Sequence, residues 1–186
     1  SRKGVQMRSD VVIIGGGPAG LMASIYSSAR GKQVLLIDRH IPPGRKLLIS
    51  GGGRCNLTNM KEVPEFLEFI PRNREFLYTA LYSMPPSSVV DMVEEMGVPT
   101  KEEENGRIFP VSDSSGDVLD ALVKKARNNG VTFKRTTARG IRIDNKRIDS
   151  VVCDDGSVVH CDSVIIAAGG MTYPETGSDG NGFTLA

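Results

Sequence analysis

The sequence is poor in the residues and patterns that several classes of protein require. Only two of its 186 residues are histidine, His40 and His160, which excludes a histidine-rich metal site and leaves no general acid or base that can be named. The three cysteines are an odd number without dense spacing, so they predict a reducing compartment rather than a disulfide scaffold. No stretch approaches the roughly 18 uninterrupted apolar residues of a membrane span, and the polar N-terminus is not that of a signal peptide. We therefore expect a cytoplasmic protein that makes no membrane contact.

An excess of charge is also missing. The 23 Lys and Arg residues nearly cancel the 22 Asp and Glu residues, which leaves a net charge of +1. Proteins that bind phosphate backbones are usually far more basic, so nucleic acid is not an expected partner. The length is that of about one domain, and the 39% hydrophobic and 24% charged contents are typical of an ordinary globular one.

Glycine is the abundant residue, with 21 of 186 residues (21/186, about 11%) against a usual value of about 7%. The first cluster of glycines, at 15–20, follows a short β-branched run over Asp10–Ile14 that predicts a buried strand. A helix is predicted over Leu21–Arg30 and a second buried strand over Gln33–Ile37, with Asp38 at its end. Together these segments predict a right-handed βαβ unit with parallel strands.

The turn in this unit has the dinucleotide-binding spacing Gly15-x-Gly17-x-x-Gly20. Gly15 permits the tight turn, Gly17 lets the backbone approach a diphosphate, and Gly20 lets the helix pack closely on the strand. The diphosphate would lie against the unpaired N–H groups at the positive end of the helix dipole. Asp38 would accept hydrogen bonds from the adenosine ribose.

The spacing leaves the identity of the dinucleotide open. Asp38 disfavours a ribose 2′-phosphate by charge repulsion, although Arg39 and Arg45 leave NADP as an alternative. Three other features favour FAD. They are a β-meander over 139–161, a strand over 164–167 that ends in Ala168-Gly169-Gly170, and a glycine-rich loop over Ser50–Asn56 that would wrap the rest of an extended cofactor.

The rest of the chain predicts one α/β domain over residues 10–186. Residues 1–9 are predicted to be a disordered leader or a cloning remnant. A 21-residue structureless loop is expected over Arg39–Asn59, a small helical insertion over 63–97, and a helix over Asp117–Asn128 before a parallel strand at Val131–Lys134. The three short strands of the meander are predicted to precede a separate last strand.

Three segments of the sequence resemble a known family. They read KLLISGGGRCNLTN at 46–59, GRIFPVS at 106–112 and GGMTYPETGSDGNG at 169–182. They closely match bacterial flavoproteins described as aminoacetone oxidase-like or as NAD(P)/FAD-dependent oxidoreductases. The resemblance covers about Asp10–Ala186 and implies a Rossmann-like, glutathione-reductase-like FAD domain.

The resemblance also implies which residues hold the cofactor. The diphosphate would lie on the glycine turn and the ribose on Asp38, while the 46–56 segment and the end of the last strand would line the rest. The predicted cofactor-binding residues are Gly15, Gly17, Pro18, Ala19, Gly20, Asp38, Arg39, Lys46, Ser50, Gly51, Gly52, Gly53, Arg54, Cys55, Asn56, Ala168, Gly169 and Gly170.

Members of this family are roughly twice as long and carry a substrate-side domain. We therefore expect that the C-terminal substrate-side part is absent and that the chain is an FAD-dependent oxidoreductase or the FAD-binding portion of one. Its flavin would accept a hydride from a small molecule, which by analogy is an amine or an amino ketone, with oxygen or a nicotinamide completing the cycle. An open cofactor cleft also favours a homodimer.

Several alternatives stay open. An NAD-dependent dehydrogenase would bind no chromophore and would need a catalytic pair that the sequence does not offer. A non-catalytic fragment would hold only FAD or its ADP half. A flavin-dependent modifier of nucleic acid fits the fold, but the neutral charge argues against it.

Arg54 and the three thiols have competing interpretations. Arg54 is interpreted as a phosphate or flavin ligand, with a carboxylate partner or a solvated charge as alternatives. Cys55 is interpreted as a small buried residue rather than a redox thiol, since no second cysteine lies near it. Cys153 and Cys161 flank a turn and are interpreted as reduced packing thiols, with a facing pair across the hairpin as the alternative.

Overall fold

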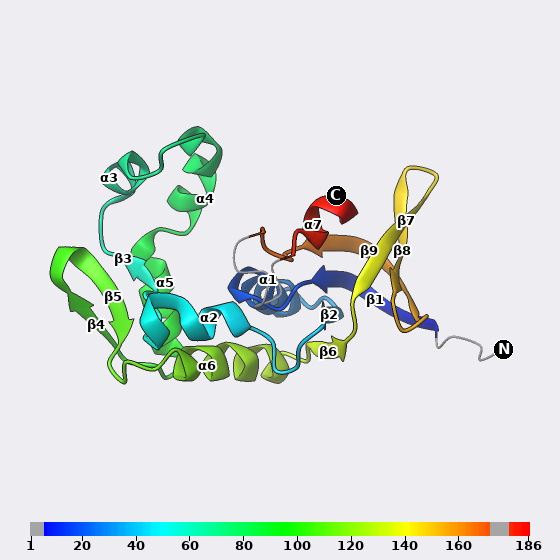
Figure 1. Cartoon of the computed structure of the whole chain (residues 1–186), viewed down its shortest axis with the longest axis horizontal. Helices are drawn as coiled ribbons and strands as arrows, with labels where there is room; N and C mark the ends of the chain where they lie inside the picture. Colours follow the sequence, from blue (N-terminus) through cyan, green and yellow to red (C-terminus); the bar gives the residue numbers. More distant parts are fainter. Residues whose placement is uncertain (1–5, 172–178) are drawn as a thin grey trace. The chain divides into compact units, whose positions relative to one another are not determined.

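The structure is a computed structural model that describes residues 6–171 and 179–186. The chain forms two compact units, one containing the residues up to Leu47 together with Leu122–Ala186, the other containing Leu48–Ala121 (Figure 1). None of the helices in the described part of the chain has the length and apolarity needed to cross a membrane. The elements in chain order are β1 (Gln6–Ile14), α1 (Pro18–Ala29), β2 (Val34–Asp38), α2 (Arg45–Ile49), η1 (Ser50–Gly53), β3 (Thr58–Asn59), α3 (Val63–Glu68), η2 (Arg74–Leu77), α4 (Tyr78–Ser83), α5 (Pro86–Glu95), β4 (Thr100–Glu103), η3 (Glu104–Gly106), β5 (Arg107–Pro110), α6 (Ser115–Asn128), β6 (Thr132–Arg135), β7 (Ala138–Asp144), β8 (Arg147–Cys153), β9 (Val158–Ile166) and α7 (Asn181–Leu185).

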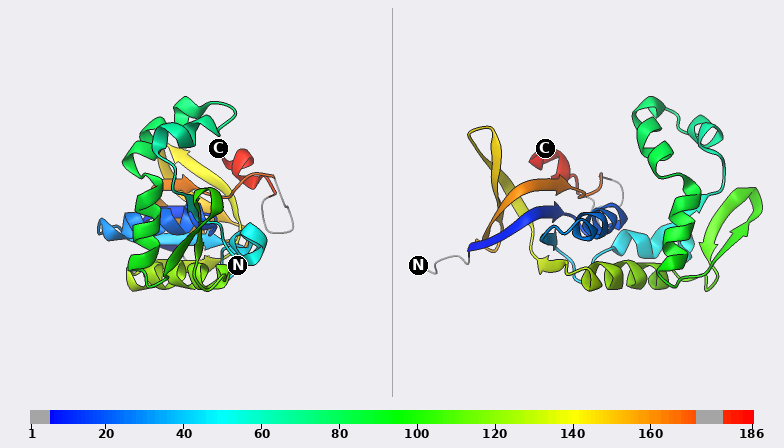
Figure 2. Two further views of the ribbon diagram at one scale, coloured as in Figure 1. Left: turned by 90° about the vertical axis from the view of Figure 1, so that its left-hand side faces the viewer. Right: turned by 180° about the vertical axis from the view of Figure 1, so that it is seen from behind.

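The first unit is built on a six-stranded sheet of order β6-β2-β1-β9-β8-β7. The four strands β6, β2, β1 and β9 are parallel, and β8 and β7 are added antiparallel at one edge. Figure 2 shows β9 running beside β1 in the same direction. The predicted α/β class, with a parallel sheet and a β-meander, is confirmed.

The central strands form because their side chains are apolar on both faces. Val12, Ile13 and Leu35 are fully buried, as expected for parallel strands covered on both sides. On one face, Val12 and Ile14 of β1 pack in a core with residues of β2, β8 and β9. Helix α1 lies against β1 and β2 and buries Leu21 and Ile25. The predicted βαβ unit is therefore present, and its strands are parallel.

The predicted separate last strand is wrong. The third strand of the meander and the last parallel strand are one continuous strand, β9. The polar residues Asp162 and Ser163 interrupt its apolar pattern, but the backbone continues to pair with β1, with Val11 opposite Ser163. Asp162 stays exposed and forms a 2.8 Å ion pair with Arg8. Pairing with β1 thus holds the strand together where the side-chain pattern predicts a break.

The predicted leader is also partly wrong. Residues 6–9 belong to β1 and pair with residues 158–161 of β9. Their polar side chains suggest a disordered segment, but the backbone of β9 provides hydrogen-bond partners that order them as a strand. Residues 1–5 lie outside the described residues.

The second unit, Leu48–Ala121, contains the predicted helical insertion as α3, η2, α4 and α5, all within residues 63–97. It also contains an antiparallel sheet of order β3-β5-β4, which the sequence did not predict because its strands have only two to four residues. The predicted structureless loop over 39–59 is wrong, since α2, η1 and β3 lie within it. The left-handed φ of +56° at Gly51 lets the chain turn tightly there.

Candidate cofactor site

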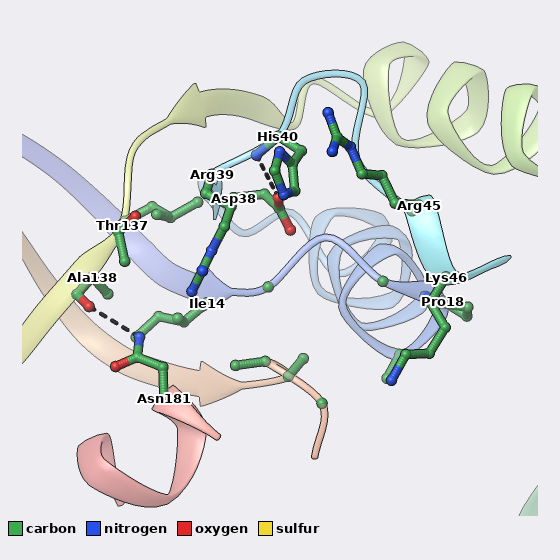
Figure 3. Close-up of a pocket in the computed structure, with 18 of the residues that line it drawn as sticks. Ile14, Pro18, Asp38, Arg39, His40, Arg45, Lys46, Thr137, Ala138 and Asn181 are labelled. Atoms are coloured by element: carbon green, nitrogen blue, oxygen red, sulfur yellow. Dashed lines mark hydrogen bonds between the residues drawn. The ribbon is translucent and has the colours of Figure 1, made fainter. Parts of the chain in front are cut away.

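A cavity of about 230 Å³ lies in the first unit, where β1 and β2 end and α1 begins (Figure 3). Ligands of open parallel sheets bind outside the carboxyl ends of the strands, which is where this cavity lies. Its walls come from the β1–α1 turn, the segment after β2, the segment between β6 and β7, the end of β9 and the start of α7. The lining residues are Ile14, Gly15, Gly17, Pro18, Ala19, Ile37, Asp38, Arg39, His40, Gly44, Arg45, Lys46, Thr136, Thr137, Ala138, Ala167, Ala168, Gly169 and Asn181.

The glycine turn closes one side of the cavity, and its three motif glycines play different parts. Gly15 has a φ of +105°, and a side chain there would collide with the carbonyl of Ala167 after β9. A side chain at Gly20 would collide with the carbonyl oxygen of Gly15. At Gly17 a Cβ would meet nothing within 4 Å, and this residue lines the cavity. The turn therefore leaves room at Gly17 for a bulky ligand group such as a diphosphate.

The start of α1 faces this room. Pro18 is the first helical residue, and in the described structure no side chain caps the helix at Gly17. Proline at this position forfeits no hydrogen bond, since its missing N–H would be unpaired in any case. The free N–H groups and the positive end of the helix dipole can hold an anion.

Asp38 connects the end of β2 to the glycine turn. Its Oδ2 accepts a 2.7 Å hydrogen bond from the backbone N–H of Gly16, and its Oδ1 accepts one of 2.7 Å from the N–H of His40. Each carboxylate oxygen has a second lone pair, so Asp38 can still accept hydrogen bonds from ligand hydroxyl groups.

Cationic side chains also line the cavity. Arg39 forms a 2.8 Å ion pair with Asp179, and the pKa of Asp179 is lowered by the N–H of Asn181 and by Arg39. The pKa of His40 is lowered by burial and then by Arg45, so the ring is neutral at physiological pH. Arg45 and Lys46 line the cavity as well. This distribution of charge suits a ligand with an anionic centre.

The far end of the cavity was missed by the sequence analysis. Thr137 and Ala138 lie at the end away from Pro18 and Lys46 (Figure 3). The amide of Asn181 donates a 3.2 Å hydrogen bond to the carbonyl of Ala138. The position of residues 136–138 just after the parallel strand β6 was the available signal, because parallel strands end at the same edge. For Asn181 the sequence offered only the glycines beside it.

The structure brings half of the predicted site residues to this cavity. Gly15, Gly17, Pro18, Ala19, Asp38, Arg39, Lys46, Ala168 and Gly169 line it. Gly20 packs behind the turn, and Gly170 is not among the lining residues. Ser50, Gly51, Gly52, Gly53, Arg54, Cys55 and Asn56 belong to the second unit. Part of the third signature, residues 172–178, lies outside the described residues.

Within the second unit the 50–56 loop is tightly folded. The N–H of Cys55 donates a 3.0 Å hydrogen bond to the carbonyl of Ser50, and Cys55 has a left-handed φ of 64°. Its side chain is 1% exposed, and burial raises the pKa of the thiol. A buried, protonated thiol agrees with the interpretation of Cys55 as a packing residue.

Arg54 has carboxylate partners. Its guanidinium hydrogen-bonds to Glu103, donates to Asp113 Oδ1 at 2.9 and 2.6 Å, and lies 4.2 Å from the centre of the Phe109 ring. These hydrogen bonds, that to Glu103 first, raise the pKa of Arg54, and Arg54 lowers the pKa of Glu103. The alternative of a carboxylate partner is thus realised, and contact of Arg54 with a cofactor stays a prediction.

The other two thiols do not face each other. Cys153 lies opposite Ala138, and its N–H donates to the carbonyl of Ser157. The β8–β9 register pairs Ser150 with His160, so Cys161 lies beyond that end of the ladder. The alternative in which Cys153 and Cys161 face each other across the hairpin is therefore wrong. Both are free and buried, as expected for packing thiols.

Comparison with known proteins identifies the family of this chain. Residues 9–186 match the model of the HI0933-like protein Rossmann domain. The chain belongs to this family. Its cofactor is FAD. The aminoacetone oxidase resemblance is confirmed at the level of this flavoprotein family only.

Curated relatives carry other names. The ribosomal RNA dihydrouridine synthase of Escherichia coli K12 is 34% identical over 179 residues, which are 96% of this chain and 44% of that protein. The 3-dehydro-bile acid delta(4,6)-reductase of Clostridium scindens is 32% identical over 94% of this chain and 42% of its own length. The chain therefore spans less than half the length of these relatives.

Solved structures share the fold. A flavocytochrome c3 fumarate reductase in its open conformation superposes with a TM-score of 0.72 at 20% identity, covering 88% of this chain and 34% of that one.

Proposed function

We propose that the cavity of the first unit binds the ADP half of FAD, and that the chain is the cofactor-holding part of an FAD-dependent oxidoreductase. The diphosphate would lie at Gly17 and the start of α1, and the adenosine ribose at Asp38. The adenine would then extend towards Thr136–Ala138, at the other end of the cavity. The observation that supports this most is the open space at Gly17, which faces the positive end of α1 and lies in the same cavity as Asp38.

The residues present fit this group chemically. The cavity offers a helix N-terminus for the anionic diphosphate, a carboxylate for the ribose hydroxyls and an uncharged wall for a flat base. When bound, the flavin supplies the exchange of a hydride with a substrate, while this chain orients the cofactor and neutralises its charge.

The experiment that tests this proposal is a visible absorption spectrum of the purified chain after FAD addition and desalting. Retention of flavin near one equivalent supports it. An NAD-dependent dehydrogenase would retain no chromophore, and a fragment limited to the ADP half would bind ADP without retaining flavin. Isothermal titration with ADP, FAD and NAD distinguishes the three outcomes.

Amine or amino-ketone oxidation, with a small-molecule substrate, remains one proposal for the reaction, based on the family resemblance alone. Reduction of a substrate is a second proposal, favoured by the names of the relatives that are 34% and 32% identical to this chain. One of those names includes ribosomal RNA, whereas the near-neutral charge argued against a nucleic-acid partner. The net charge of +1 is that of this chain alone, which aligns with less than half of the length of the ribosomal RNA dihydrouridine synthase. The charge therefore says nothing about the remaining part of such a protein.

Anaerobic spectroscopy of the FAD-loaded protein separates the two reactions. Under oxidation, aminoacetone or a related amine bleaches the oxidised flavin. Under reduction, photoreduced flavin regains its absorption on mixing with a uridine-containing RNA or an unsaturated ketone. The same pair of mixing experiments is repeated with free FAD as the control.

A cytoplasmic location and a homodimer are part of the proposal. The three free, buried cysteines support a reducing compartment. Static light scattering of the purified chain tests the dimer, and a monomer at high concentration contradicts it.

A further inference from the structure

Asp154, in the turn between β8 and β9, lies outside the cavity but holds one of its walls. Its Oδ1 accepts a 2.7 Å hydrogen bond from the Thr136 hydroxyl and a 3.1 Å bond from the N–H of Thr137. Its own N–H donates 2.9 Å to the carbonyl of Thr137. One residue of the meander thus makes three hydrogen bonds to the segment between β6 and β7.

That segment has few other means of support. β6 ends at Arg135 and β7 begins at Ala138, so Thr136 and Thr137 lie between the two strands. The N–H of Thr136 donates 3.1 Å to the carbonyl of Asp38, which ties the segment to the end of β2. The Asp154 carboxylate supplies the partners for the Thr136 hydroxyl and the Thr137 N–H. Thr136 is only 6% exposed, so loss of the acceptor would leave its hydroxyl buried without a partner.

The same segment forms the far wall of the cavity through Thr136, Thr137 and Ala138. If the diphosphate lies at Gly17 and the ribose at Asp38, this wall faces the adenine. Displacement of the wall by a fraction of an ångström would disturb the fit to a flat base, although no atom of Asp154 lines the cavity.

We propose that Asp154 is a positioning residue of the cofactor site, which acts through Thr136 and Thr137 to hold the wall that receives the adenine. The inference rests on the proposed function, because it needs an adenine nucleotide in this cavity. Asp154 touches no part of the ligand and acts as a hydrogen-bond acceptor rather than as a charge.

The neighbouring Asp155 provides a matched control. It lies in the same turn and has the same charge, but it pairs with Lys134 at 2.8 Å and accepts hydrogen bonds from Ser157. None of these three residues lines the cavity. Replacement of either aspartate removes one negative charge and several hydrogen bonds from the turn, but only replacement of Asp154 releases the wall.

The experiment measures the dissociation constants of ADP and FAD by isothermal titration, and thermal unfolding by circular dichroism, for the full chain and three variants. We expect Asp154→Ala to weaken ADP and FAD binding by about tenfold, which is about 1.4 kcal/mol of binding free energy, because the wall is no longer held in place. Asp154→Asn keeps an acceptor oxygen and should stay within about threefold of the unmodified chain. Asp155→Ala should lower the unfolding temperature without a change in either dissociation constant.

The outcomes are separable. If the unmodified chain binds neither ADP nor FAD, the proposed function fails. If it binds both and Asp154→Ala binds them as Asp155→Ala does, the positioning role is overturned. The role is also overturned if Asp154→Asn binds ADP and FAD as weakly as Asp154→Ala does. Should Asp154→Ala not fold, Thr136→Val removes the hydroxyl donor instead. An unchanged ADP affinity in that variant overturns the role, and a loss of about threefold or more supports it.

Discussion

The carboxylate of Asp38 and the backbone N–H of Gly16 are joined by a 2.7 Å hydrogen bond. The acidic residue at the end of β2 therefore holds the glycine turn that follows β1, in addition to its predicted contact with a ribose. Its second oxygen binds the N–H of His40, which directs the chain after β2 along the rim of the cavity. One side chain thus holds both the turn where we propose that the diphosphate binds and the segment beside the proposed position of the sugar.

Substitution Asp38→Ala should abolish most FAD binding, with a loss of about a hundredfold, because it releases the turn and removes the ribose acceptor. Asp10→Ala is the matched control. Asp10 makes the same type of bond, 2.7 Å to the N–H of Gln33, away from the cavity. Fluorescence titration with FAD measures both variants. Equal FAD affinities in the two would contradict the assignment of Asp38.

Glycines 17 and 20 should respond in opposite ways to replacement by alanine. Gly17→Ala places a methyl group in open space in the cavity, so we expect weaker ADP binding with an unchanged unfolding temperature. Gly20→Ala forces a methyl group against the carbonyl of Gly15, which should destabilise the chain by about 1–3 kcal/mol. Calorimetric titration and thermal unfolding of both variants check this. An unchanged ADP affinity in Gly17→Ala would count against diphosphate binding there.

The ion pairs of Arg54 with Glu103 and Asp113 should make the unfolding temperature depend on pH in the acid range. Arg54 lowers the pKa of Glu103, and Lys101 and then Arg54 lower the pKa of Asp113. A carboxyl whose pKa is lower in the folded state stabilises it fully above its unfolded pKa of about 4, and this stabilisation is lost as the pH falls through the folded value. As the pH falls from about 4 to about 2, the unfolding temperature of Arg54→Met should therefore decrease less than that of the unmodified chain. If the unfolding temperatures of the two proteins decrease by the same amount over this pH range, Arg54 does not stabilise the fold through these two carboxylates.

The three thiols should be unreactive in the folded chain. Burial raises the pKa of Cys55, of Cys153 and of Cys161, the last to about 11, so all three are protonated at neutral pH. We expect almost no alkylation by iodoacetamide at pH 7.5 and three adducts after unfolding in guanidinium, counted by mass spectrometry. Rapid alkylation of Cys55 in the folded chain would instead revive its interpretation as a redox residue.

The parts predicted well are those where local pattern and tertiary environment agree. The run Val11–Ile14, the three motif glycines and Asp38 lie within one βαβ unit, where a strand buried on both faces must be apolar and the turn must lack side chains. The β-meander was also predicted, because its turns contain Asn145 and Gly156, which adopt positive φ. The sequence pattern wrongly divides β9 into two strands, because its polar residues interrupt the apolar run. The pairing with β1 that keeps the strand continuous is a long-range interaction, which the local pattern does not contain.

The sequence by itself determined the βαβ unit, the glycine turn and the acidic residue at the end of β2, because these depend on steric limits and burial over fewer than about 40 residues. Only the tertiary structure decided that Thr136–Ala138 and Asn181 complete the cavity, that Asp154 braces its wall, and that Arg54 binds Glu103 and Asp113. These contacts join residues far apart in the chain. Such hydrogen bonds depend on distances of a few tenths of an ångström that packing of the whole sheet imposes, and no local pattern encodes them.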